Sequence, residues 1–218
     1  MYYMDIIENN SICLDDGFDC FIAAAGSDYR AYQMLNKFEK HNTSIKIFFL
    51  FDFKERFEDL PQEDIEAYNS YESFGFKPEI IECSIMDPSY CIKSLFASKS
   101  NLSSNDNIAI DISCFTKPYF FSIIKYLKNQ IVVKLITVLY TEPMSYIFDK
   151  GSYHSGYGQL SVMEVPGYPG LNTRATESVL IILLGFEGEF SSFITEDIAS
   201  DKIILVEIVG KVPKKRLN

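Results

Sequence analysis

Short, almost wholly apolar runs alternate along the chain with segments whose apolar residues recur at helical spacing. Such runs are typical of strands covered on both faces, whereas apolar residues three and four positions apart indicate amphipathic helices. The first 142 residues therefore contain five predicted strands separated by helices. The predicted strands are residues 19–25, 45–51, 79–84, 108–113 and 132–140, and the predicted helices are 27–40, 62–74, 88–99 and 118–128. In the last of these helices Phe121, Ile124 and Leu127 lie on one apolar face.

This alternation predicts the fold class. Parallel strands need a crossover connection, usually a helix, and such crossovers are right-handed. We therefore expect an α/β protein with a doubly wound, mostly parallel Rossmann-like sheet, flanking helices and a C-terminal extension of the sheet. If the strand order is 3-2-1-4-5, the order reverses between the first and fourth strands, and ligands of open α/β sheets bind beside such a point.

The pattern changes after the Rossmann-like core predicted for residues 1–142. Residues 151–170 contain five glycines, three tyrosines and two prolines. Because glycine permits movement and tyrosine can stack on a base, the region 143–178 is either a lid or an ordered loop that completes the core. Residues 179–218 are predicted as a strand at 179–184, a helix near 190–199 and a strand at 202–209, all in the same domain as the core.

Composition narrows the class of partner. A chain of 218 residues suits one domain with a full hydrophobic core. Its formal net charge of −10 argues against long DNA or RNA as the main partner, because an acidic surface repels the phosphate backbone. A small nucleotide is still compatible with this charge, since its binding depends on a local pocket.

Cysteine usage and hydropathy indicate a cytoplasmic protein. The five cysteines include no C-x-x-C pair, which predicts buried thiols in a reducing compartment. The longest apolar runs reach six to nine residues, whereas a membrane-spanning helix needs about twenty. With two histidines, no G-x-G-x-x-G and no G-x-x-x-x-G-K-[ST], the sequence predicts no metal site and no cofactor.

The turn after the fourth predicted strand carries the clearest chemistry. Lys117 precedes Pro118, which suits the first turn of a helix. A cation is disfavoured at this end of a helix unless an anion binds there, in which case free backbone N–H groups and Lys117 would both face it. The structural alternative is that Thr116 caps the helix while Lys117 pairs with a nearby acid.

The turn after the first predicted strand would lie at the same edge of the sheet as the turn after the fourth. Gly26, Ser27, Asp28 and Arg30 are candidates for ligand contacts, with Ser27 as a cap and Asp28 as a favourable first-turn acid in the structural alternative.

Three acids are candidates for acid–base chemistry. Asp28 lies in the first turn, and Asp52 ends the second strand, where an acid can bind a ribose hydroxyl. Glu142 follows the fifth strand and would act as a general acid or base if it were buried. The alternative for Asp52 and Glu142 is a solvated position at the end of a strand, and the alternative for Asp28 is a favourable charge in the first turn of a helix.

The segment from Ile110 to Pro118 (IDISCFTKP) resembles the strand-4 motif of CARF domains, in which a strand is followed by a small-residue turn ending in Thr-Lys-Pro. Those domains are Rossmann-like sensors of cyclic oligoadenylates in bacterial antiviral systems. The resemblance implies ligand contacts from Ser113, Thr116 and Lys117, with the turn 26–30 opposite. Cys114 and Phe115 depart from the family, which has two glycines there, and Phe115 would obstruct a phosphate that approached the backbone.

The stretches around Gly26, Asp111 and Gly185 are also similar to uncharacterised Rossmann-like proteins of bacterial defence loci. The resemblances imply a nucleotide-binding sensor or sensor-effector of prokaryotic antiviral defence that acts as a homodimer or with a partner protein. One alternative is a hydrolase that cleaves an N-glycosidic or phosphodiester bond of a nucleotide or nucleoside, with Asp28, Asp52 or Glu142 as its acid or base. The other is a non-catalytic interaction subunit.

Overall fold

The chain divides into two compact units, one of residues 1–143 with 165–168 and one of residues 144–164 with 169–218. The boundary near residue 143 falls where the sequence pattern changes. The computed structural model describes residues 17–26, 30–31, 33–35, 45–53, 75–84, 87–89, 92–93, 102–103, 106–130, 134–142, 164–168, 177–184, 194–196 and 198–207.

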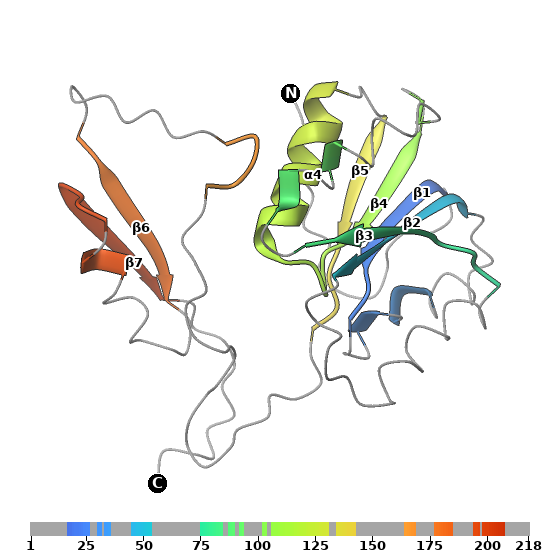
Figure 1. Cartoon of the computed structure of the whole chain (residues 1–218), viewed down its shortest axis with the longest axis horizontal. Coiled ribbons are helices and arrows are strands. Elements are labelled where there is room, and N and C mark those ends of the chain that lie inside the picture. Colours follow the sequence, from blue (N-terminus) through green and yellow to red (C-terminus); the bar gives the residue numbers. More distant parts are fainter. Residues whose placement is uncertain are drawn as a thin grey trace, which may run out of the picture. The chain divides into compact units, whose positions relative to one another are not determined.

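The first unit contains a parallel sheet of five strands (Figure 1). Every neighbouring pair of strands is parallel, as the sequence predicted. The strand order is β3-β2-β1-β4-β5, which is the order assumed when the site was placed from the sequence. The order reverses between β1 and β4: from β1 the chain adds β2 and β3 on one side, and from β4 it adds β5 on the other. The strands are β1 (Phe18–Ala24), β2 (Ile45–Phe53), β3 (Glu79–Cys83), β4 (Asn107–Asp111) and β5 (Leu135–Leu139).

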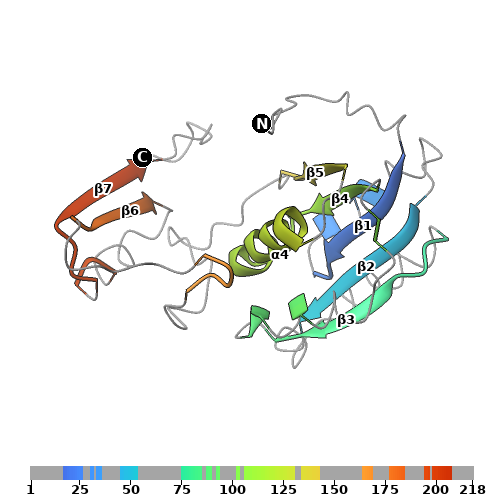
Figure 2. The same cartoon turned by 90° about the horizontal axis from the view of Figure 1, so that it is seen from above.

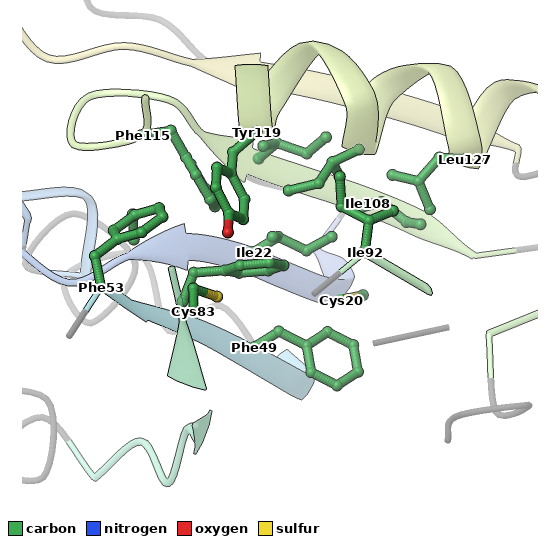
Figure 3. Close-up of a cluster of buried hydrophobic side chains, with 14 residues drawn as sticks. Cys20, Ile22, Phe49, Phe53, Cys83, Ile92, Ile108, Phe115, Tyr119 and Leu127 are labelled. Atoms are coloured by element: carbon green, nitrogen blue, oxygen red, sulfur yellow. The ribbon is translucent and has the colours of Figure 1, made fainter. Parts of the chain in front are cut away.

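Helix α4 (Lys117–Gln130) lies along one face of this sheet (Figures 1 and 2). Tyr119, Ile123 and Leu127 follow one another at four-residue spacing and are fully buried. They meet strand residues such as Ile22 and Phe49, and Figure 3 shows Tyr119 and Leu127 pointing from the helix toward the strands. The apolar stripe of α4 therefore closes the larger of two core clusters.

One residue of α4 was assigned to the wrong face by its spacing. Phe121 was expected on the buried side, yet it is 44 % exposed and packs against the Tyr168 ring with centroids 6.3 Å apart. The buried stripe instead runs through Tyr119, whose ring lies 4.8 Å from that of Phe53 and whose hydroxyl donates to the Ser84 carbonyl. Both Tyr119 and Phe121 are aromatic and lie near the start of the helix. The spacing of apolar residues therefore did not show which of the two is buried.

The opposite face of the sheet is covered by the segment after β1. Residues 30–31 and 33–35 are helical, and Met34 and Leu35 pack on Ala23, Leu50 and Ala109. Both faces of the central strands are thus buried, which explains why β1 and β4 have no polar alternation over most of their length.

The second unit contains β6 (Val179–Leu184) and β7 (Lys202–Glu207), which pair in parallel. The sequence predicted that these two strands extend the main sheet, and that prediction is wrong. In the part of the chain that the structure describes, they form a two-stranded sheet of their own. Strand character follows from the local apolar run, whereas the neighbour of a strand depends on distant segments. The assignment of residues 179–218 to the same domain stays a prediction.

Other predictions have mixed outcomes. Cys20, Cys83 and Cys114 are free thiols, and the first two are buried in the core as expected. The predicted helix 62–74 lies outside the described residues, and of the predicted helix 190–199, residues 194–196 are described and helical. Among the helices that the structure describes, none is long and apolar enough to cross a membrane.

Candidate functional site

The carboxyl ends of β1 and β4 lie side by side at the point where the strand order reverses. The register pairs Ile22 with Ile110, so both strands end at the same edge of the sheet. Beyond β4, the chain continues the sheet ladder for one residue, because Ile112 N donates to Leu139 O at 2.9 Å. It then turns toward α4. The two turns that the sequence singled out therefore follow neighbouring strands.

Asp111, the last residue of β4, is the most deeply buried acid at this edge, with 2 % of its surface exposed. Ile110 belongs to the core cluster beneath α4, whereas Ala109 belongs to the cluster on the opposite face. Because side chains alternate along a strand, Asp111 shares the face of Ala109, away from α4. An acid buried in this way is rare unless its charge is paired or used.

One oxygen of Asp111 is well supplied with donors. Ser113 N donates to Asp111 Oδ1 at 3.0 Å, and Ser113 Oγ donates to the same oxygen at 2.5 Å. Ser113 Oγ in turn accepts from Thr141 N at 2.8 Å. We call Asp111, Ser113 and Thr141 the Asp111 cluster. It ties the turn after β4 to the residues that follow β5.

Other polar atoms at this edge have no such donors or acceptors. Asp111 Oδ2, Thr116 Oγ1 and Thr141 Oγ1 are buried and have no hydrogen-bond partner among the described residues. Buried polar groups in native proteins are nearly always hydrogen-bonded, so each exception calls for an explanation such as a bound ligand, an ordered water or a catalytic role. The ends of β4 and β5 therefore carry buried polar atoms of which some have hydrogen-bond partners and others have none among the described residues.

Burial raises the pKa of Asp111 from its ordinary value of 3.8 to about 6, against the opposing effect of the two Ser113 hydrogen bonds and the Arg30 charge. Arg30 belongs to the helical segment after β1. The charge of Arg30 lowers the pKa of Asp111 slightly, so this residue lies near the carboxyl end of β4. An acid of this pKa changes its charge near neutral pH, which is uncommon outside functional sites.

The start of α4 has the features that an anion would use. Lys117 is the exposed first residue of the helix, and the first turn contains no acid. The backbone oxygen of Thr116 accepts from Tyr119 N at 3.1 Å, but its Oγ1 does not cap the helix. Within the described residues Lys117 forms no ion pair. The cap and the ion pair of the structural alternative are therefore both missing from this part of the chain.

Phe115, which departs from the CARF pattern, lies in the core and not over the turn. It is 8 % exposed, and its ring centroid lies 5.2 Å from that of Phe51 (Figure 3). The expected obstruction of the backbone by this ring is therefore wrong. A large aromatic side chain is more stable among Phe51, Phe53 and Tyr119 than in water.

The remaining predicted residues are only partly brought together. Gly26 lies two residues beyond the end of β1 and is half-buried, whereas Ser27 and Asp28 lie outside the described residues. Asp52 is half-buried in β2 next to Glu82 of β3, so β1 separates it from Asp111. Glu142 is exposed after β5, so the burial on which its acid–base role depended is absent.

The predicted lid is described only at its end. Tyr168 N donates to Val165 O at 3.0 Å, and Gly167 has a φ of 89°, as expected for a turn with Pro then Gly at its centre. This turn packs on the middle of α4, where Ser122 Oγ donates to Pro166 O at 2.8 Å. Residues 143–163, which would form most of a lid, lie outside the described residues.

Asp111 is a candidate functional residue that the sequence pattern did not identify as a ligand contact. Its signal was an acid inside the otherwise apolar run Ile108–Ile112. No cluster of three or more metal-binding side chains occurs among the residues that the structure covers. Comparisons with protein-family models, with curated proteins and with solved structures find no match for this chain.

Proposed function

We propose that this protein is a nucleotide-binding sensor whose ligand binds at the carboxyl ends of β1 and β4. The observation that carries the proposal is the unsatisfied oxygen of the buried Asp111 at the point where the strand order reverses. A general rule of open α/β sheets places ligands there. A small molecule with both an anionic group and hydrogen-bond donors fits the residues present.

The anionic group would lie at the start of α4. Helix starts attract anions, because their first N–H groups are free and the helix dipole is positive there. Lys117 adds a full charge at this position, and Arg30 adds another on the other side of the edge. These charges are local exceptions in a chain whose net charge is −10, so they favour a small anion over a long polyanion.

The biological role in this proposal rests on the resemblance of residues 110–118 to CARF domains. On that basis the protein is a sensor or sensor-effector of prokaryotic antiviral defence, acting as a homodimer or with a partner protein. The burial of Phe115 supports the resemblance, because the position where the family has glycine leaves the turn uncovered.

Native mass spectrometry with cyclic tetra-adenylate, NAD and ATP tests the proposal. We expect one of these nucleotides to be retained intact, and Lys117→Ala to weaken its binding tenfold or more. A charge-assisted hydrogen bond is worth about 1.5–3 kcal/mol, and about 1.4 kcal/mol corresponds to a tenfold change. The fold should be unaffected, because Lys117 is exposed.

Lys128→Ala is the matched control, since Lys128 lies in the last turn of the same helix. Equal affinities of the two variants would remove Lys117 from the site. Conversion of the nucleotide into a lighter product would favour the hydrolase instead. Retention of no nucleotide at all would contradict the proposal and leave the interaction subunit as the leading function.

A further inference from the structure

We propose that Asp111 selects the ligand by accepting a hydrogen from a hydroxyl or amino group of the bound nucleotide through Oδ2. This inference rests on the proposed function, and it adds a chemical requirement to it. The ligand must present a hydrogen-bond donor at the end of β4 as well as an anion at the start of α4. Ribose and adenine both provide such donors.

The Ser113 donors and the Thr141 amide near Asp111 are already committed. Ser113 N and Ser113 Oγ both donate to Oδ1, at 3.0 and 2.5 Å. The Thr141 amide is used as well, because it donates to Ser113 Oγ. These contacts fix the carboxyl group firmly in one orientation. Oδ2 is thereby held in place with no donor from the described residues.

Arg30 does not donate a hydrogen bond to Asp111 Oδ2. Its charge lowers the pKa of Asp111, which places it in the neighbourhood. The Thr116 and Thr141 hydroxyls do not supply the donor either, since each is buried without a partner in the described part of the chain. Above pH 6 Asp111 is mostly a carboxylate, whose oxygens only accept hydrogen bonds, so the missing group is a donor there.

The location of Oδ2 separates this contact from the anion site. Asp111 lies on the sheet face opposite α4, whereas Lys117 begins α4 itself. The turn of residues 112–116 joins them across the edge of the sheet. A ligand that touches both must extend over this edge, as a nucleotide does when its phosphate and its sugar or base are held by different groups.

The test uses whichever adenine nucleotide native mass spectrometry finds bound, ATP, NAD or cyclic tetra-adenylate, with its deoxyribose and inosine counterparts. The wild-type protein should bind one counterpart about 10- to 100-fold more weakly, since a hydrogen bond to a charged group is lost. Weaker binding of a deoxyribose form assigns the donor to a ribose hydroxyl. Weaker binding of the inosine form assigns it to the adenine amino group.

Asp111→Asn should bind the parent nucleotide at least tenfold more weakly and reduce the discrimination to within about threefold, because the charge of the acceptor is lost. Its folding should be intact, since an Asn oxygen still accepts from Ser113. Asp106→Asn is the matched control. Asp106 directly precedes β4 at the other edge of the sheet, and its Oδ2 accepts from Ser103 N at 2.7 Å. It should keep both affinity and discrimination.

Several outcomes would overturn the inference. Equal binding of all counterparts by the wild-type protein would mean that no donor is read, although nucleotide binding itself would stand. Wild-type discrimination that persists in Asp111→Asn would assign the selection to another residue. A large loss of thermal stability in Asp111→Asn would show that the charge is structural. If the wild-type protein retains no nucleotide, the proposed function fails and this inference fails with it.

Discussion

The buried or half-buried acids at the two edges of the five-stranded sheet differ in the hydrogen bonds that they accept. At the edge where the strands begin, Asp19 receives a hydrogen bond on each oxygen, from Lys46 Nζ at 2.5 Å and from Asn107 N at 3.0 Å. These contacts connect β1 to β2 and β4. At the edge where the strands end, Asp111 receives both of its hydrogen bonds on one oxygen, and the other oxygen has none among the described residues.

The pKa values follow this difference. The hydrogen bond from Lys46 and that from the Asn107 amide lower the pKa of Asp19, whereas burial raises the pKa of Asp111 to about 6. Ionised Asp19 therefore stabilises the fold, and ionised Asp111 destabilises it. An acid that remains buried at the expense of stability is more readily explained by function than by folding. The comparison thus separates a structural acid at one edge from the candidate ligand contact at the other, which accords with the proposed function.

The largest effect that tests this comparison is expected in the pH dependence of the free energy of unfolding, through the titration of Asp111. Its pKa in the folded protein, about 6, exceeds the ordinary value of 3.8. Between these values the folded state keeps a proton that the unfolded state releases, so stability falls as pH rises from about 4 to 6 and is level above. At about 1.4 kcal/mol per pKa unit, the loss is on the order of 3 kcal/mol.

Urea unfolding of the wild-type protein and Asp111→Asn across this pH range measures that loss. The variant lacks the titrating group, so its free energy of unfolding should rise relative to the wild type as pH increases. A constant difference between the two proteins would mean that Asp111 does not titrate in this range. The apparent burial of its charge would then have no energetic consequence.

The next effect comes from Ser113→Ala. This change removes one hydrogen bond to Asp111 and leaves Thr141 N without its acceptor. Leaving buried polar groups unsatisfied costs about 1–3 kcal/mol, so we expect a loss in that range. Combining Ser113→Ala with Asp111→Asn in a double-mutant cycle should give a coupling energy of at least about 0.5 kcal/mol. Additive losses would show that the Asp111 cluster does not act as a unit.

The smallest effect is expected at the opposite edge, from Asp19→Asn. Exposed ion pairs contribute little and are screened by salt, so the variant should be only slightly less stable and should equal the wild type at high salt. Because the pKa of Asp19 is lowered, its contribution is present above the unfolded pKa and is lost as pH falls toward the acid range. A loss larger than that of Ser113→Ala would reverse the assignment of the two edges.

The elements were the most predictable part of this protein. The helix predicted for residues 118–128 is found at Lys117–Gln130, and the strand predicted for 179–184 has those bounds. The spacing of apolar residues is a property of a short stretch of chain, so it predicts a helix or strand without information on the segments that pack against it. Phe121 shows its limit, because which side of a helix is buried depends on what packs there, and Tyr168 is 47 residues further along the chain.

The candidate site was predictable in location but not in its central residue. The turns after β1 and β4 were identified from sequence, because loops at strand ends carry the polar residues. Asp111 was visible only as an acid within an apolar run. Its meaning depends on which of its oxygens finds a donor, and the Ser113 and Thr141 contacts that decide this arise from two separate strands.

The sequence by itself determined the class of this protein and the strands and helices from which its sheet is built, because each of these follows from residues adjacent in the chain. Only the tertiary structure decided that Phe115 lies in the core, that β6 and β7 pair with each other, and that Asp111 is buried with one oxygen unsatisfied. Burial and hydrogen bonding are properties of a side chain's surroundings, and those surroundings are assembled from segments far apart in the chain.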